Sequence, residues 1–202
     1  MYVPPAFGVD DDAAWGIVAD AGLGVWAAVG PDGLVGAFAP VLVSDDRSTL
    51  RAHVARANPF WRALGDGAEV LVTFLAASAY VSPALYPSRV AAPGVVPTWN
   101  YAAAEVRGTA RVVDDAAWLR ELVTDLTDRF EEGLEPRWWV SESPDDYVER
   151  QLRAIVGIVV TVASIQGKAK LSQNRPEEDR ASVRDAFATG SSAERIVASR
   201  MP

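Results

Sequence analysis

The stretch Ile155–Ile165, IVGIVVTVASI, is the strongest strand signal in the sequence. It is apolar and rich in β-branched residues, which fit the pleated surface of a buried strand. A polar segment, Gly167–Arg175, follows it directly. We therefore predict a buried strand that ends in this polar segment.

Further apolar runs precede this stretch and also predict strands. They are Leu23–Val29, Leu34–Val43, Thr49–Val54, Val70–Leu75, Tyr80–Ser82 and Thr98–Val113. Turn residues separate the first three runs, namely Pro31-Asp32-Gly33 and Ser44-Asp45-Asp46. These separators indicate that the first three strands form an antiparallel meander.

Helices are predicted between these strands and after the last one. Their expected ranges are Asp10–Gly22, Asn58–Leu64, Asp114–Phe130, a short helix after Pro144, and Pro176–Phe187. Asn58 is a good N-cap residue ahead of Pro59, and Asp114 is expected to cap the helix that ends near Phe130. That helix has apolar residues at helical spacing, which predict core or dimer contacts: Trp118, Leu119, Leu122, Val123, Leu126 and Phe130.

The order of these elements predicts the fold class. The strands follow one another through short turns and do not alternate regularly with helices, which argues against a doubly wound parallel sheet. We predict a mainly β, or α+β, fold: an antiparallel β-barrel with peripheral helices. Residues 1–202 are expected to form a single domain with a C-terminal helical extension.

The composition limits the possible chemistry and partners. A net charge of -8 gives no general attraction to nucleic-acid backbones or anionic lipid. The sequence has no cysteine and its only histidine is His53, so thiol chemistry is excluded and no metal site is predicted. The first residues lack a secretory pattern, and no apolar run approaches the roughly 20 residues of a spanning helix. We therefore expect a cytoplasmic protein.

Common catalytic motifs are missing from the sequence. Gly22-Leu23-Gly24 lacks the third glycine of the dinucleotide-binding fingerprint, and no nucleophile elbow surrounds a serine. A Ser-His-Asp triad would have to use His53, and nothing near it in the sequence supports one. Hydrolase chemistry is therefore not expected, and no catalytic residue is assigned.

Two proline-rich stretches predict long irregular loops. Residues 83–97 form the first, and such loops in compact domains are often functional or mobile. The second loop lies between Pro136 and Pro144 and carries Trp138 and Trp139. An adjacent pair suggests one ring turned inward and one in a dimer contact or over a cleft, although simple core filling is an equal alternative.

The segment Val96–Tyr101, VPTWNY, is the main candidate for ligand binding. Trp99 and Tyr101 offer aromatic faces, while Thr98 and Asn100 offer hydrogen-bonding groups. Planar heteroaromatic ligands need this combination of apolar area and a few fixed polar groups. The alternative is a rigid turn into a strand, with both rings in the core.

The segment His53–Trp61, HVARANPFW, is a candidate anion site. A strand gives way to a helix here, so backbone N–H groups, Arg56 and Asn58 could converge on one anion. Alternatively, Asn58 caps the helix, Trp61 packs, and Arg56 is a solvated surface charge.

A second basic segment lies at the end of the strongest strand. Lys168 and Lys170 alternate on one strand face, and Ser172, Gln173, Asn174 and Arg175 follow them. A phosphate would make this arrangement favourable, but simple solvation of two like charges fits equally well.

Taken together, these segments resemble the PaiB-like family of FMN-binding negative transcriptional regulators. The matching stretches, in the family's order, are Met1–Pro4, His53–Pro59 with Trp61, Tyr80–Pro83 with Tyr86, Val96–Tyr101, Ile155–Gly157 and Gly167–Arg175. This family resembles the FMN-binding split barrels, relatives of pyridoxamine-phosphate oxidase, which form homodimers with flavin at the subunit interface. The resemblance implies an antiparallel split β-barrel, FMN as the cofactor, and a homodimer.

The resemblance also implies which residues contact FMN. The segment around His53, Arg56 and Asn58 would hold the phosphate, the VPTWNY segment would lie beside the ring, and Lys168–Asn174 could reach in from the partner subunit. The expected cofactor-binding residues are His53, Arg56, Asn58, Trp61, Tyr80, Ser82, Thr98, Trp99, Asn100, Tyr101, Lys168, Lys170, Ser172, Gln173 and Asn174.

Two functions follow from the resemblance. The first is an FMN-binding regulator or redox sensor, and the alternative is an FMN-dependent oxidoreductase acting on an unidentified small molecule. Tight operator binding by this chain alone is not expected, because the charge is negative and no helix-turn-helix pattern gathers basic residues. A regulatory role would therefore act through a metabolite or a partner protein.

Overall fold

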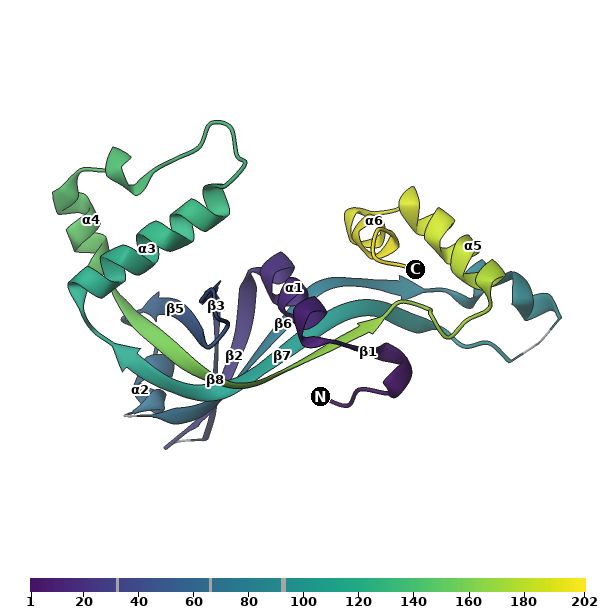
Figure 1. Cartoon of the computed structure of the whole chain (residues 1–202), viewed down its shortest axis with the longest axis horizontal. Coiled ribbons are helices and arrows are strands. Elements are labelled where there is room, and N and C mark those ends of the chain that lie inside the picture. Colours follow the sequence, from purple (N-terminus) through teal and green to yellow (C-terminus); the bar gives the residue numbers. More distant parts are fainter. Residues whose placement is uncertain (32, 66, 92–93) are drawn as a thin grey trace. The chain divides into compact units, whose positions relative to one another are not determined.

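The chain forms two compact units, each assembled from separated segments. The computed structural model describes residues 1–31, 33–65, 67–91 and 94–202. Unit 1 comprises Met1–Ala21, Phe74–Glu105 and Ile165–Pro202, and unit 2 comprises Gly22–Thr73 and Val106–Ser164. Figure 1 follows the chain through its helices and strands. That residues 1–202 act as a single domain stays a prediction.

Strands dominate the secondary structure. They are β1 (Gly8–Val9), β2 (Leu23–Gly30), β3 (Gly33–Pro40), β4 (Leu42–Val43), β5 (Thr49–Ala55), β6 (Ala68–Val81), β7 (Thr98–Val113) and β8 (Ile155–Lys170). The α-helices are α1 (Asp11–Ala21), α2 (Phe60–Leu64), α3 (Ala116–Glu131), α4 (Asp145–Leu152), α5 (Glu177–Ala188) and α6 (Ser192–Ala198). Short 3-10 helices are η1 (Pro5–Phe7), η2 (Pro83–Leu85), η3 (Pro87–Val90) and η4 (Val140–Glu142). The predicted mainly β class with peripheral helices is confirmed.

The strand order differs from a meander. It is β3-β2-β6-β7-β8-β5-β4, and β1 pairs with β8. β2 and β3 form an antiparallel hairpin, whereas β5 pairs along its length with β8, so that His53 lies opposite Gly157. Both predicted antiparallel pairings are present, because β2 pairs with β3 and β4 pairs with β5. The continuous meander is not, because the second predicted run is interrupted at Val41, and pairing of β5 with the apolar strand β8 leaves β3 and β4 at opposite ends of the strand order.

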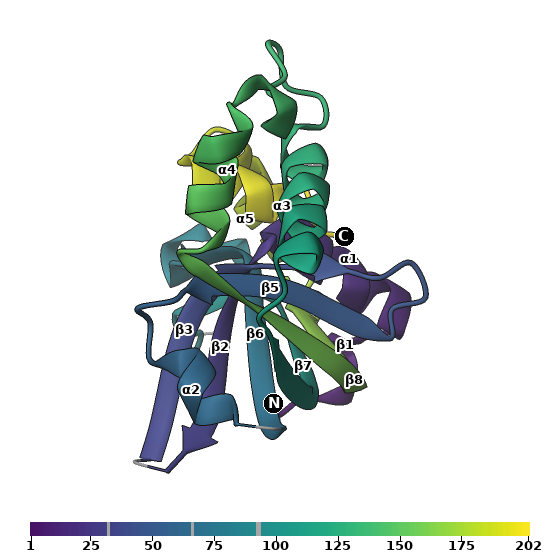
Figure 2. The same cartoon turned by 90° about the vertical axis from the view of Figure 1, so that its left-hand side faces the viewer.

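The core of unit 2 includes one face of the β2–β3 hairpin. Buried residues alternate along both strands, with Trp26 and Ala28 on β2 and Ala37 and Ala39 on β3. The short helix α2 lies beside this hairpin (Figure 2), and its Phe60 ring meets the Trp26 ring edge to face at 6.5 Å between centroids. The alternation follows from the two-residue period of a strand, which sends neighbouring side chains to opposite faces.

Helix α3 packs in unit 2 through the face that the sequence predicts. Leu119, Leu122 and Leu126 are buried, while Phe130 near the helix end is half exposed. The cap differs from the prediction by one residue, because the Asp115 carboxylate accepts from the Trp118 backbone N–H at 2.7 Å. Asp114 therefore does not cap α3, and its carboxylate pairs with Arg56.

Unit 1 has its own core, in which α5 and α6 pack together with strand residues. The buried cluster comprises Ala77, Ala79, Val81, Tyr86, Leu171, Val183, Phe187, Val197, Ala198 and Met201. Helix α6 was not predicted. Its signal is a capping box, in which Ser191 Oγ accepts from the Glu194 N–H and the Glu194 carboxylate accepts from the Ser191 N–H.

Several predicted boundaries move. Val70–Leu75 and the first two residues of Tyr80–Ser82 belong to one strand, β6, which ends at Val81, and β8 continues from Ile165 to Lys170. Small residues between Leu75 and Tyr80 hid this continuity, because alanine and serine give no strand signal. Asp32 of a predicted turn and Pro93 of the predicted loop lie outside the described residues. Within the described part of the chain, no helix has the length and apolarity needed to span a membrane.

Candidate functional site

Aromatic and cationic side chains gather on three neighbouring strands of unit 1. Tyr80 comes from β6, Trp99 and Tyr101 from β7, and Lys168 and Lys170 from β8. The Tyr80 and Trp99 rings meet edge to face, with 6.1 Å between centroids and 71° between planes. Trp99 is 54% exposed and Tyr80 50% exposed, so the rings present accessible aromatic surface. We call these five residues the aromatic–lysine cluster.

Both lysines are held by groups of the same unit. Lys170 Nζ donates to the Thr98 hydroxyl and, at 3.0 Å, to the Trp99 carbonyl oxygen. Lys168 Nζ lies 5.3 Å from the centroid of the Tyr101 ring and donates to the Tyr2 carbonyl oxygen at 3.2 Å. Cation–π contact and carbonyl acceptors therefore position the two ammonium groups.

The electrostatics of this cluster favour an anion. Burial, followed by the nearby charges of Lys168 and Arg175, lowers the pKa of Lys170 below that of a free lysine side chain. A cation that is partly desolvated and repelled by other cations is stabilised when an anion binds. The cluster thus combines a charge suited to phosphate with rings suited to a flat heteroaromatic group.

Ser172 and Gln173, which follow β8, form hydrogen bonds within the protein, and Ser172 does so with Asn100 of β7. Asn100 is fully buried, and its amide nitrogen lies 3.0 Å from Ser172 Oγ. Ser172 has a left-handed backbone, with φ of 63°. Gln173 folds back, donating to the Ala169 carbonyl at 2.5 Å and accepting from the Leu171 N–H at 2.6 Å. These bonds fix the turn that directly follows Lys170.

Ser82 and Asn174 are the two remaining predicted residues of unit 1. Ser82 follows β6, and its hydroxyl accepts from the Ala84 N–H at 3.2 Å, which caps η2. Asn174 is exposed in the turn before α5.

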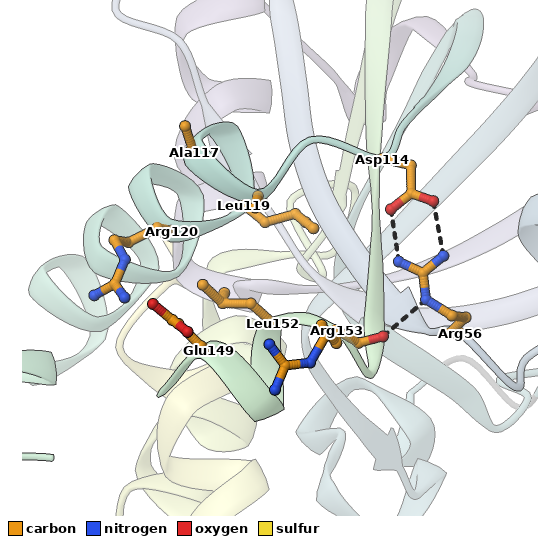
Figure 3. Close-up of a pocket in the computed structure, with 9 residues that line it drawn as sticks. Arg56, Asp114, Ala117, Leu119, Arg120, Glu149, Leu152 and Arg153 are labelled. Atoms are coloured by element: carbon orange, nitrogen blue, oxygen red, sulfur yellow. Dashed lines mark hydrogen bonds and ion pairs between the residues drawn. The ribbon is translucent and has the colours of Figure 1, made fainter. Parts of the chain in front are cut away.

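In unit 2, Arg56 is fully engaged with protein groups (Figure 3). Its two terminal nitrogens donate to the Asp114 carboxylate at 2.8 and 2.6 Å. Further bonds run to the carbonyl oxygens of Arg153 at 2.8 Å and Ile155 at 3.0 Å. The pairing raises the pKa of Arg56 and lowers that of Asp114, chiefly through their hydrogen bonds. Arg56 thus links β5 to Asp114 and to the start of β8, and the Asp114 carboxylate compensates its positive charge.

The other predicted residues of the first basic segment also have structural roles. Asn58 Oδ1 accepts from the Phe60 N–H at 2.9 Å, and Trp61 Nε1 donates to the Arg56 carbonyl at 2.9 Å. His53 is mostly enclosed, its Nδ1 has no partner among the described residues, and burial lowers its pKa. A neutral imidazole and a paired guanidinium attract a phosphate weakly.

The predicted cofactor residues thus separate into two sets. Unit 1 brings the aromatic–lysine cluster, Thr98 and the Asn100–Ser172 pair into one region of linked contacts, whereas His53, Arg56, Asn58 and Trp61 belong to unit 2. Contact of the second set with the FMN phosphate stays a prediction. The donor set of unit 1 fits FMN, with ammonium groups for a phosphate and indole and phenol rings for isoalloxazine.

Sequence reasoning missed two contacts that matter here, namely that of Tyr2 in unit 1 and that of Asp114 with Arg56. Arg175 was part of the second basic segment but not of the expected cofactor-binding residues, and its charge lies near Lys170. A signal for the cluster was nevertheless present. Lys168 and Lys170 are the only lysines in the whole sequence. Their placement two residues apart on one strand is therefore more specific than an ordinary pair of surface charges.

Comparison with known proteins identifies the class. Residues 1–164 match the family described as "Putative FMN-binding domain", and the chain belongs to this family. It is also 32% identical over 183 residues to "Protease synthase and sporulation protein PAI 2" of Bacillus subtilis (strain 168), which covers 89% of this chain and 85% of that protein. The resemblance to the PaiB-like family is confirmed, and so is FMN as the cofactor of the family.

Solved structures agree on the fold. The FAD and heme binding protein from Mycobacterium smegmatis superposes with a TM-score of 0.59 at 20% identity, covering 91% of this chain and 80% of that one. Flavocytochrome Anf3 from Azotobacter vinelandii gives a TM-score of 0.57 at 15% identity, covering 85% and 73%. At such identities the likeness concerns the fold alone, and the predicted split-barrel class with peripheral helices is confirmed.

Proposed function

We propose that the protein binds FMN at the aromatic–lysine cluster and acts as a flavin-dependent regulatory or redox-sensing homodimer. One observation carries the placement of the cofactor. Both lysines of the sequence lie beside Trp99 and Tyr101 on neighbouring strands, and the second of them is held in a partly desolvated, cation-rich position.

Each part of the cluster has a counterpart on the cofactor. Lys168 and Lys170 would hold the phosphate, whose charge would offset their mutual repulsion. Trp99 and Tyr80 would cover the flat ring system, since both rings are accessible. Bound FMN supplies electron-transfer chemistry, and these side chains bind and orient it. The buried Asn100–Ser172 pair would keep the segment after Lys170 in place.

Titration of the purified full-length chain with FMN tests this proposal. Flavin fluorescence and the visible flavin spectrum report binding. Each of Lys168→Ala and Lys170→Ala should weaken FMN binding by about tenfold to a hundredfold, because each removes one charge-assisted contact to phosphate. Trp99→Ala should weaken it through lost stacking.

Asn58→Ala provides the matched comparison from unit 2. Asn58 Oδ1 accepts from the Phe60 N–H at the start of α2, so loss of its side chain should lower stability and leave FMN affinity within about twofold once the protein is folded. Strong loss of FMN binding in Asn58→Ala, with normal binding in both lysine variants, would place the cofactor in the other set and refute our assignment.

An exposed apolar face supports the homodimer. On the side of the β2–β3 hairpin opposite its buried face, Val25 lies across from Phe38, and Val29 across from Leu34. These four residues are 43%, 70%, 73% and 79% exposed, respectively. A continuous apolar sheet face of this kind is characteristic of a protein–protein interface. We therefore propose that a second copy of the chain covers it.

The name of the Bacillus subtilis relative refers to protease synthesis and sporulation, which supports a regulatory role. An FMN-dependent oxidoreductase is the second candidate, favoured by the exposure of Trp99 and Tyr80, which leaves room for another reactant. Adding NADH or NADPH to the FMN-loaded protein separates the two. Rapid bleaching of the flavin would support the oxidoreductase, and a stable oxidised flavin would support the sensor.

A further inference from the structure

Unit 2 contains a groove that the proposed flavin site does not use. Two hollows, of about 270 and 410 Å³, share the three residues His53, Val123 and Trp138. The larger hollow is also lined by α4 residues, including Tyr147 and Val148. We call the joined hollows the Trp138 groove. The larger hollow has the volume of a pocket for a single small molecule.

His53 contributes an imidazole ring to the lining of both hollows. It lies on β5, and its Nδ1 is enclosed and has no hydrogen-bond partner among the described residues. His53 lines both hollows, and its Nε2 is not among the enclosed atoms without a partner in the described part of the chain. Burial lowers the pKa of His53, so the imidazole is neutral at neutral pH. A neutral imidazole nitrogen can form one hydrogen bond with a ligand hydroxyl.

Trp138 is fixed as one wall of the groove. The Glu131 carboxylate accepts from the Trp138 backbone N–H at 3.1 Å. The neighbouring Trp139 has different surroundings, because the Arg137 guanidinium lies 3.7 Å from the centroid of its ring. One tryptophan of the adjacent pair therefore lines the groove, whereas the other stacks on an arginine.

The lining excludes strongly charged ligands. Among the described residues that border the two hollows, there is no lysine or arginine, and the one carboxylate, Glu131, already accepts the Trp138 N–H. An anion would find no counter-charge. Apolar side chains of α3 and α4, such as Val123 and Leu152, make up much of the remaining wall.

We propose that the Trp138 groove is a binding site for a small uncharged aromatic molecule that carries one hydroxyl group. The aromatic body would lie against Trp138 and the apolar residues of α3 and α4. The hydroxyl would bond to the accessible edge of His53, and since a hydroxyl both donates and accepts, either neutral tautomer serves. Under the function proposed above, this site is distinct from the FMN site, because none of its lining residues belongs to the aromatic–lysine cluster.

The test uses p-cresol as the probe and p-xylene as its matched partner, in which a methyl group replaces the hydroxyl. Binding to the full-length, FMN-saturated protein is followed by saturation-transfer NMR. We expect p-cresol to bind with a dissociation constant on the order of 1 mM. p-Xylene should bind about tenfold more weakly, as expected for the loss of one hydrogen bond.

Three variants locate the site. Trp138→Ala should weaken p-cresol binding at least about tenfold, whereas Trp139→Ala, the matched control, should leave it unchanged. His53→Phe keeps a flat ring and should abolish the preference for p-cresol over p-xylene. The proposal is wrong if p-cresol does not bind saturably, if the two tryptophan variants behave alike, or if His53→Phe retains the preference. If His53→Phe does not fold, the proposal is tested by the affinities of the unmodified protein for p-cresol and p-xylene and by comparing p-cresol binding to Trp138→Ala and Trp139→Ala.

Discussion

At the scale of single residues, two cations from predicted anion sites have opposite surroundings. Arg56 has four hydrogen bonds to protein groups, including a bidentate pair with Asp114. Lys170 has two neutral acceptors and is crowded by Lys168 and Arg175. A bound anion would stabilise Arg56 little, because Asp114 already compensates its charge. It would stabilise Lys170 more, because the charges near Lys170 are positive. This difference makes Lys170 the residue to probe.

Acylation of the lysine amines tests the state of Lys170. Because its pKa is lowered, more of its amine is neutral at a given pH, so it should reach its maximal rate at lower pH than a free lysine amine. At neutral pH the larger neutral fraction should make Lys170 react faster than the free amine. Peptide mapping by mass spectrometry is unambiguous, since Lys168 and Lys170 are the only lysines in the sequence.

Added FMN should slow the acylation of both lysines, and inorganic phosphate should do so more weakly. The reference is a free lysine derivative in the same tube, whose rate must not change with FMN. Equal rates for Lys170 and the reference, with no protection by FMN, would contradict both the crowding and the placement of the phosphate.

At the scale of elements, the contact of α3 with β8 depends on one glycine. A Cβ atom at Gly157 would lie 2.2 Å from Trp118 Cζ3 and 3.0 Å from the Val113 carbonyl oxygen. The backbone oxygen cannot move aside cheaply, so α3 fits over the strand only where a side chain is absent. The same Gly157 lies opposite His53, which places this contact next to β5.

Gly157→Ala should lower the free energy of unfolding by about 2 to 4 kcal/mol, because it overpacks this contact. Chemical denaturation measures the change. Gly16→Ala is the matched control, since a Cβ atom there would meet nothing within 4 Å and the residue lies inside α1. That control should leave stability unchanged or raise it by up to about 1 kcal/mol. Similar effects of the two substitutions would disprove the close contact.

At the scale of the whole molecule, the proposed dimer depends on the exposed face of the β2–β3 hairpin. A stable interface buries on the order of 1,000 Å² or more, and charged residues are depleted at its centre. Val29→Glu would place a charge there and should shift the protein from dimer to monomer, as measured by sedimentation velocity. Val96→Glu replaces an exposed valine of unit 1 outside this face and should leave the dimer intact. A monomeric unmodified protein, or dissociation by both variants alike, would refute the proposed interface.

How far the sequence predicts the molecule varies between its parts. β7 was predicted with its observed bounds, because Pro97 precedes it and the helix-capping pair Asp114-Asp115 follows it. α6 was missed because its seven residues have little periodicity, and only the Ser191–Glu194 box marks it. The tryptophan and both lysines of the cluster were predicted as binding residues, since their residue types carry the chemistry. Tyr2 was not, because its contact with Lys168 spans nearly the whole chain.

The sequence by itself determined the strands, most of the helices and the residue types that recommend FMN, since side-chain period, capping and charge are local properties. Only the tertiary structure decided which of these residues meet. It paired β5 with β8, gave Asp114 to Arg56 instead of to α3, and gathered Tyr80, Trp99 and Lys168 from three strands. Such contacts depend on strand order and register, which are fixed by burial of whole faces and not by neighbouring residues.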